Sequence, residues 1–258
     1  MNDITVLGAY GTKGVNVGTS AFLIDERNVI DAGNLLIPLR EKSASIENIW
    51  LSHSHLDHII DIAYILDSYF IERKTPLKIY GVAPTIECLK NDFLNDRIWP
   101  DFSKIKMSDS NEMSVQYEVI EYYKEYKISN ESSIMAYDTD HTVPSCGYVI
   151  TKKDSAVIVT SDTYDLQRTF DLIEKNTNIK ALVVECSFPS RMENLAHDSK
   201  HLTPKILFEK LQGLKREDIK FYINHIKPLF LEEMTREIEL FKGDFDVKIL
   251  KDGEKIYF

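Results

Sequence analysis

The hydrophobic pattern of residues 1–100 predicts short strands followed by helices. The stretches ITVLGAY and SAFLIDERNVIDAG alternate as strands do and end in turn residues, and ENIWLS predicts a short buried strand from Ile49 to Leu51. Apolar residues at helical spacing in DIAYILDSYFIERK and APTIECLKNDFL predict two helices around the strand LKIYG, the second with Pro84 in its first turn. We therefore expect strands that pack against helices in this segment.

The remainder of the chain predicts strands first and then strands that alternate with helices. Residues 112–150 are rich in strand pattern, in SVQYEVIEYY, YKISN, SSIMAYDTDH and CGYVITKK. The apolar stretches SAVIVTSDT, KALVVECSF and IKFYINH predict buried strands, and DLQRTFDLIEKN, TPKILFEKLQGL and LEEMTREIELFK predict helices. The final stretch VKILKDGEKIYF predicts a hairpin with an Asp-Gly turn. Two sheets with helices packed outside them satisfy this order.

Composition predicts one globular domain over residues 1–258 in a cytoplasmic protein. No linker, repeat or secretory signal is visible, no apolar run approaches the roughly 20 residues that span a bilayer, and the three cysteines form no close pair. The net charge of −10 makes a nucleic-acid partner unfavourable but permits a small anionic substrate. The sequence leaves the oligomeric state open, with a homodimer as the commonest oligomer.

Four candidate metal ligands fall within six residues of the stretch LSHSHLDHII. His53, His55 and Asp57 can face one side of an extended segment, whereas Asp57 and His58 are adjacent and must diverge. Two ions, one at the histidine pair and one at Asp57 and His58, satisfy this geometry. Imidazole nitrogen and carboxylate oxygen suit zinc, and also manganese or iron. The alternative is a group of surface histidines, against which the apolar residues on both sides argue.

The motif HSHLDH resembles the HxHxDH signature of the metallo-β-lactamase fold superfamily, and the resemblance extends from Ile4 to the C-terminus. It implies an α/β fold, an αββα four-layer sandwich of two mixed β-sheets with helices on the outer faces. It also implies two divalent ions, held by ligands that each follow a strand. These are His53, His55 and His141 on one ion, Asp57, His58 and His225 on the other, and Asp162 between them.

A glutamate and a histidine further along the chain suggest the type of reaction. Glu185 closes a buried strand, and His201 precedes a helix start at Thr203 and Pro204, where free N–H groups favour a phosphate. A histidine there can protonate a leaving alkoxide, and a glutamate can orient it. The elements Glu-Cys-Ser-Phe and His-Leu-Thr resemble those of the phosphodiesterase branch of the superfamily, which includes RNase Z-type tRNA endonucleases and class II cyclic nucleotide phosphodiesterases.

Within this branch the chain resembles the class II 3′,5′-cyclic nucleotide phosphodiesterases more than the tRNA enzymes. The leucine before Asp57, the form HLTP and the Trp-Pro element in NDRIWPDF are similar, although IIDIAYILDS stands where that family has a glycine-containing turn. The resemblance implies hydrolysis of cyclic AMP or cyclic GMP to 5′-nucleotides by attack of a metal hydroxide on phosphorus. Asp57, Glu185 and His201 would be catalytic, with His201 protonating the departing 3′-oxygen.

Binding of the nucleotide would require further residues. We expect Trp99 and Phe188 to offer stacking surfaces for the base and Thr203 to contact substrate, with ordinary packing as the alternative. Cys186 is interpreted as a small hydrophobic residue rather than a nucleophile, and His197 as a surface residue.

Three other functions remain open from sequence. An RNase Z-type nuclease would need a basic arm, which the chain does not show. In a lactonase or thioesterase, Glu185 and His201 would be structural. A protein that only binds metal would not need the complete ligand set.

Overall fold

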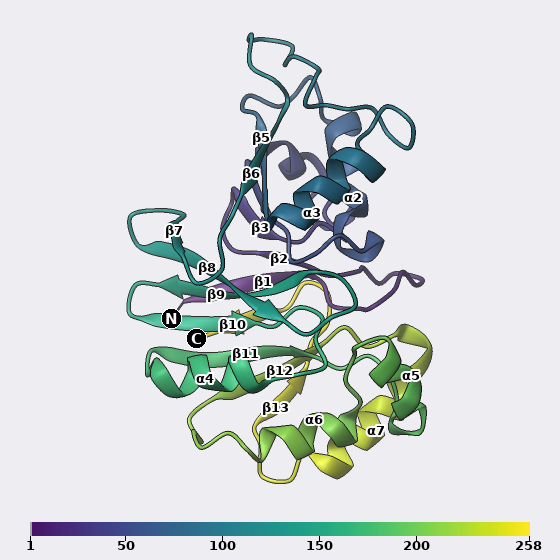
Figure 1. Cartoon of the computed structure of the whole chain (residues 1–258), viewed down its shortest axis with the longest axis vertical. Coiled ribbons are helices and arrows are strands. Elements are labelled where there is room, and N and C mark those ends of the chain that lie inside the picture. The colour runs from purple at the N-terminus through teal and green to yellow at the C-terminus, as the bar shows by residue number, and fades with distance from the viewer. Residues whose placement is uncertain (1) are drawn as a thin grey trace.

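Two seven-stranded β-sheets face each other in the computed structural model, which describes residues 2–258 (Figure 1). The first sheet contains, in spatial order, β14 (Lys255–Tyr257), β1 (Asp3–Gly8), β2 (Ala21–Leu23), β3 (Asn28–Ile30), β4 (Asn48–Trp50), β5 (Leu77–Gly81) and β6 (Val115–Val119). The second contains β13 (Val247–Ile249), β12 (Lys220–Asn224), β11 (Ile179–Glu185), β10 (Ser155–Val159), β9 (Ser145–Lys152), β8 (Ser132–Thr139) and β7 (Glu125–Lys127).

Helices cover the outer faces of both sheets. The first sheet carries α1 (Leu36–Leu39), α2 (Leu56–Ser68) and α3 (Ala83–Cys88), and the second carries α4 (Gln167–Lys175), α5 (Glu193–Asp198), α6 (Pro204–Leu211) and α7 (Leu231–Phe241) (Figure 1). This arrangement confirms the predicted αββα sandwich of two mixed sheets. No helix within residues 2–258 is long and apolar enough to cross a membrane.

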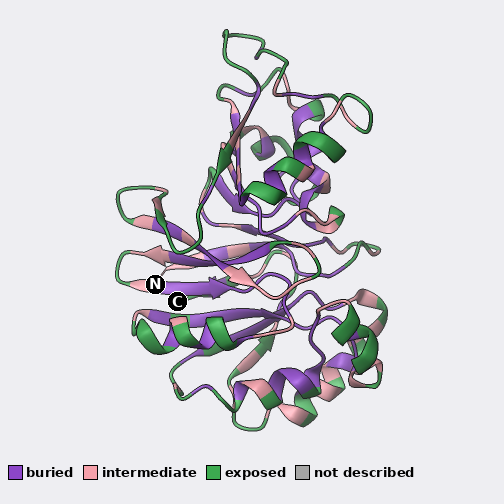
Figure 2. Cartoon of the chain, viewed as in Figure 1, coloured by how far each residue is buried: buried purple, intermediate pink, exposed green. Residues whose placement is uncertain are grey.

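Three apolar cores hold the four layers together, and the strands between them are buried along most of their length (Figure 2). Phe22, Trp50 and Tyr148 belong to the core between the two sheets. The strands β10 and β11 contribute residues to cores on both of their faces, which explains why they read as continuous apolar runs.

The strands that precede the predicted site residues end at one edge of the sandwich. The strands β10, β11 and β12 are parallel to one another, and β8 runs in the same direction because β8 and β10 are both antiparallel to β9. Segments that leave the carboxyl ends of parallel strands meet at one edge, where α/β proteins place their ligands. The site is built there.

The predicted terminal hairpin is wrong, because its two strands belong to different sheets. The strand β13 pairs with β12, and β14 pairs with β1. The carboxylate of Asp252 accepts hydrogen bonds from the backbone N–H groups of Ala9, at 2.8 Å, and Gly18, at 2.7 Å. These bonds tie the connecting segment to the first sheet, so the chain crosses between sheets where a local turn was expected.

The helix after the histidine motif also begins earlier than its periodicity predicted. It starts at Leu56 rather than at residue 61 and ends at Ser68. His55 stands at the N-cap with an extended backbone, so that Asp57 and His58 lie in the first helical turn. The motif is therefore a joint between a loop and a helix.

Candidate metal centre and active site

The structure brings all seven predicted metal ligands together at the edge of the sandwich. One group comprises His53, His55, His141 and Asp162, and another comprises Asp57, His58 and His225; within each, one ligand atom per residue lies within 4.8 Å of the others. Asp162 touches both groups, since its Oδ2 lies 3.7 Å from His53 Nε2 and its Oδ1 lies 3.2 Å from His225 Nε2. The division matches the two predicted ligand sets, with Asp162 between them.

The joint between loop and helix explains how one short stretch serves both groups. His53 and His55 lie on the extended segment that leaves β4, and both join the group that contains His141. Asp57 and His58 lie on α2 and join the group that contains His225. The change from extended to helical backbone after His55 turns the later two side chains toward the second group.

Buried polar atoms without partners show that these residues fit a bound cation. The Nε2 atom of His53 and the Oδ1 atom of Asp162 are buried and make no hydrogen bond. An unsatisfied buried polar atom costs about 1–3 kcal/mol, and such atoms are rare in folded proteins. A divalent ion would satisfy both, and imidazole nitrogen with carboxylate oxygen is a donor set that such ions accept.

The protonation states favour the same conclusion. Burial lowers the pKa of His53 well below its usual value, and burial also lowers the pKa of His55 and brings that of His141 to about 4. These rings are therefore neutral near pH 7 and keep a lone pair for a metal. Burial alone would raise the pKa of Asp162, but His225 and His58 outweigh burial and hold that pKa well below its usual value.

A buried aspartate that the sequence reasoning missed supports the cluster from behind. Asp31 follows β3 and is 1% exposed. Its Oδ2 lies 2.7 Å from His58 Nδ1, and its carboxylate also accepts the backbone N–H and the hydroxyl of Ser52, each at 2.8 Å. The signal available in the sequence was an aspartate directly after a buried strand, in VIDAG.

Glu185 and His201 lie against the cluster, as the resemblance implied. The Oε1 atom of Glu185 accepts a hydrogen bond from His201 Nδ1 at 2.9 Å, and both residues are buried. The ring centroid of His201 lies 5.1 Å from that of His141 and 5.3 Å from that of His225. Burial alone would lower the pKa of His201, but Glu185 outweighs burial and raises it.

Ser187 is a second residue that sequence reasoning missed, and it links this pair to the cluster. Its hydroxyl donates to Glu185 Oε2 at 3.0 Å and lies 2.9 Å from His225 Nδ1. Because the one hydroxyl proton goes to Glu185, the Nδ1 atom of His225 must be the donor to Ser187. The Nε2 atom of His225 is then left with its lone pair toward the cluster.

The three residues expected to bind substrate lie outside the histidine and aspartate cluster. Thr203 is fully buried, and its hydroxyl caps α6 by accepting the N–H of Ile206. Phe188 is 7% exposed and packs edge-on against His201, at a ring distance of 5.8 Å. Trp99 is half-buried beside α2, with its ring centroid 5.8 Å from that of Tyr64.

Two expectations about other residues agree with the structure. His197 is exposed on α5, where it pairs with Asp198. Cys186 is fully buried in an apolar core, and burial raises the pKa of its thiol well above the usual value. A thiolate nucleophile at this position is therefore unfavourable.

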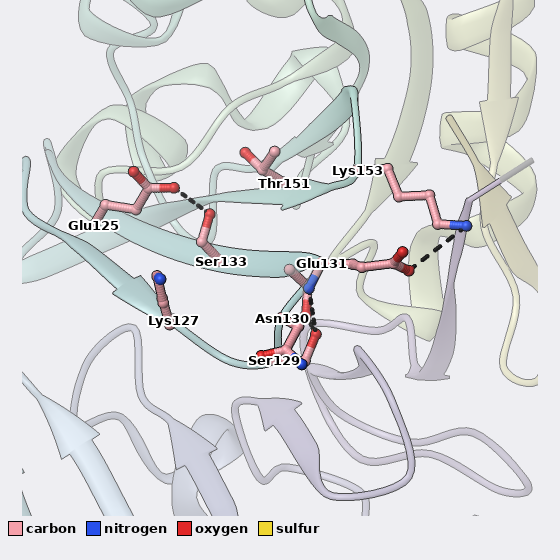
Figure 3. A pocket seen from close by; sticks show the side chains of 9 residues that line it. Glu125, Lys127, Ser129, Asn130, Glu131, Ser133, Thr151 and Lys153 are labelled. Atoms are coloured by element: carbon pink, nitrogen blue, oxygen red, sulfur yellow. Dashed lines mark hydrogen bonds and ion pairs between the residues drawn. The ribbon is translucent and has the colours of Figure 1, made fainter.

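A separate cavity of about 510 Å³ lies along the hairpin of β7 and β8 (Figure 3). Its labelled side chains are polar, and some of them pair with one another, as Glu131 does with Lys153 at 3.6 Å. It contains no histidine and lies near Ser133, whereas His141 follows the opposite end of β8. The cavity therefore does not belong to the candidate centre.

A model of the class-II cAMP phosphodiesterase family matches residues 30–235, which is well over half of the chain. The chain belongs to this family. It is 25% identical over 228 residues to 3′,5′-cyclic-nucleotide phosphodiesterase 1 of Saccharomyces cerevisiae, and 27% identical over 213 residues to a probable 3′,5′-cyclic-nucleotide phosphodiesterase of Yersinia pestis. These matches cover 78% and 72% of the chain but only 60% and 58% of the relatives, so the chain spans less than two thirds of their length.

Solved structures show the same fold. The crystal structure of unliganded yeast PDE1 superposes with a TM-score of 0.82 at 20% identity, over 99% of both chains. The metallo-β-lactamase fold protein YhfI of Bacillus subtilis superposes with a TM-score of 0.76 at 19% identity, also over 99% of both chains. The class II member described here thus has the metallo-β-lactamase fold.

Proposed function

We propose that this protein hydrolyses 3′,5′-cyclic nucleotides to 5′-nucleotides. Membership of the class-II family and the names of the yeast and Yersinia relatives support this substrate class. The observation that carries the proposal is the contact between Glu185 and His201 beside the histidine and aspartate cluster. A proton donor next to a candidate metal centre is the arrangement that cleavage of a phosphodiester requires.

The cluster would hold two divalent ions, for which the donor set of imidazole nitrogen and carboxylate oxygen favours zinc. His53, His55 and His141 would bind one, Asp57, His58 and His225 the other, with Asp162 between them. Bound ions would activate a water molecule and neutralise charge on the phosphoryl oxygens. The chain provides the arrangement of ligands, in which Ser187 fixes the ring of His225 and Asp31 fixes that of His58.

His201 would protonate the 3′-oxygen as it leaves phosphorus. Its Nδ1 atom is held by Glu185, so Nε2 is the atom that can deliver a proton toward the cluster. The raised pKa of His201 keeps more of it protonated near neutral pH. Glu185 would also stabilise the cationic ring until the proton is transferred.

The test uses the metal-loaded protein and two variants. We expect cyclic AMP or cyclic GMP to give the 5′-nucleotide, and His201→Ala to lower kcat by about 10²–10⁴-fold without loss of metal, as for removal of a general acid. His197→Ala is the matched control, since His197 is exposed, and it should retain full activity. The loss in His201→Ala should be smaller for bis(p-nitrophenyl) phosphate, whose leaving group needs no proton.

Two outcomes would contradict the proposal. Turnover of a simple lactone alone would assign the chain to another class of hydrolase. Cleavage of a pre-tRNA without any turnover of cyclic nucleotides would assign it to the nucleases, one of which, ribonuclease Z of Pyrococcus abyssi, is 26% identical to the chain over 163 residues.

A further inference from the structure

An apolar groove begins beside the candidate centre, at the first turn of α2. Its volume is about 440 Å³, and it runs between α2 and residues 93–99. Leu56, Tyr64 and Ile98 line it while remaining 59%, 43% and 63% exposed. Trp99 forms part of the same wall, with its ring nearly perpendicular to that of Tyr64. A concave site lined mainly by apolar side chains is a candidate ligand site.

The groove adjoins the side on which the cluster opens to solvent. The side chain of Asp57 is 28% exposed and His55 is half-buried, whereas the side chains of His53 and Asp162 are at most 3% exposed. A substrate therefore reaches the cluster past residues 55–57. The groove is lined by Ser54 and Leu56, the residues on either side of His55. The opening of the cluster to solvent and the groove are therefore both formed by residues 54–57.

We propose that this groove holds the nucleobase of a nucleotide whose phosphate lies at the cluster. The inference rests on the proposed function and adds the position of the base. A purine or pyrimidine has apolar faces that pack against aromatic and aliphatic side chains, and Tyr64, Ile98 and Trp99 provide them. Eleven residues line the groove, about half of what each partner contributes to a stable protein interface, so its size fits a base better than a second subunit.

The groove also indicates how the base is recognised. The Nε1 atom of Trp99 is buried without a partner, so the indole presents carbon atoms rather than its N–H to the groove. The polar side chains in the lining are Ser54, Cys88 and Asp92. Recognition by stacking tolerates every base, because every base has an aromatic face. We therefore expect cyclic AMP and cyclic GMP to differ by less than about tenfold in kcat/KM.

Kinetics with and without a base test this assignment. The probes are cyclic AMP and the 3′,5′-cyclic phosphate of methyl riboside, which lacks the base. We expect the double variant Tyr64→Ala/Ile98→Ala to raise KM for cyclic AMP about tenfold, the range found for stacking on an aromatic residue, and to leave the baseless substrate unchanged. Leu240→Ala on α7 is the control, because Leu240 is also exposed, at 75%, and lies outside the groove.

Binding can be measured independently of turnover. The chain has two tryptophans, and Trp50 is 3% exposed and stacked on Tyr80 with a ring distance of 3.9 Å. In Trp50→Phe, emission therefore reports Trp99 alone. We expect 5′-AMP to change this emission and ribose 5-phosphate to leave it unchanged.

The outcomes separate this inference from the proposed function. Equal kcat/KM for cyclic AMP and the baseless substrate, or an unchanged Trp99 emission with 5′-AMP, would overturn the position of the base. A double variant that changes from dimer to monomer in sedimentation with unchanged KM would overturn it too and assign the groove to a subunit interface. If no cyclic nucleotide is turned over, the proposed function fails, and the emission titration then decides about the groove alone.

Discussion

The carboxylate of Asp31 lies 2.7 Å from the Nδ1 atom of His58, and both side chains are almost completely buried. A carboxylate behind a metal-binding histidine fixes the tautomer and the orientation of the ring. Burial alone would lower the pKa of His58, but Asp162 and Asp31 outweigh burial and raise it. Asp31 therefore holds a ring that would otherwise have two orientations available.

We predict that Asp31→Asn lowers the affinity of the cluster for zinc by about 10- to 100-fold, the usual effect of losing such a partner. The amide keeps the shape but removes the charge that favours the His58 ring. Competition with a chelator of known affinity measures the change. Asp109→Asn, at an exposed site paired with Lys74, is the control and should retain the affinity of the unmodified protein. Equal affinities for the two variants would refute the role of Asp31.

The sequence predicts the parts of this centre that lie in one short stretch and misses those that depend on distant contacts. The HSHLDH stretch shows four of the seven residues of the cluster, and the family resemblance adds His141, Asp162 and His225, which lie within three residues of a strand end. The contact between Asp31 and His58 spans 27 residues and that between Ser187 and His225 spans 38. Contacts between residues so far apart in the chain leave no helical or strand spacing that could be recognised in the sequence.

Backbone conformation at the strand ends is a second feature that the sequence pattern does not predict. Asp31, Ser161 and His225 have φ angles of 56°, 55° and 66°, which non-glycine residues rarely adopt. Such conformations concentrate at functional sites, where the surrounding structure enforces them. Each of the three turns a side chain at a strand end in a direction that strand periodicity does not predict.

Ser187→Ala should weaken the half of the centre that contains His225. Without the hydroxyl, the Nδ1 atom of His225 and the carboxylate of Glu185 both lose a partner at distances of 2.9 and 3.0 Å. We expect one of two ions to bind about tenfold more weakly, a loss of roughly 1.4 kcal/mol. Calorimetric zinc titration of the metal-free protein resolves the two ions. Ser187→Thr keeps the hydroxyl and should restore most of the affinity, whereas equal losses in both variants would indicate a purely steric effect.

Removal of metal should lower the melting temperature. When the free metal concentration is about a hundred times the dissociation constant, binding to the folded chain adds roughly 2.7 kcal/mol to the free energy of unfolding. For a domain of this size, this corresponds to a fall of about 5–10 °C after chelation. Differential scanning calorimetry before chelation, after it and after return of zinc measures the effect, with metal content determined on each sample. An unchanged melting temperature in protein shown to be free of metal would argue against a bound ion at the cluster.

Gly11→Ala should displace His225 and so weaken metal binding, because no side chain fits between Gly11 and His225. A Cβ atom at Gly11 would lie 2.4 Å from the backbone oxygen of His225 and 2.7 Å from its Nδ1 atom. The backbone oxygen cannot yield without moving the strand end, so His225 would shift away from Ser187. We expect about 1–3 kcal/mol of destabilisation, typical of overpacking, together with weaker binding of one ion.

Gly81→Ala is the matched control, since Gly81 is also buried but its Cβ would meet nothing nearer than 3.4 Å. Denaturant unfolding and zinc titration of both variants measure the two effects, and a Gly11→Ala protein as stable and as metal-avid as Gly81→Ala would show that His225 is not held by this contact.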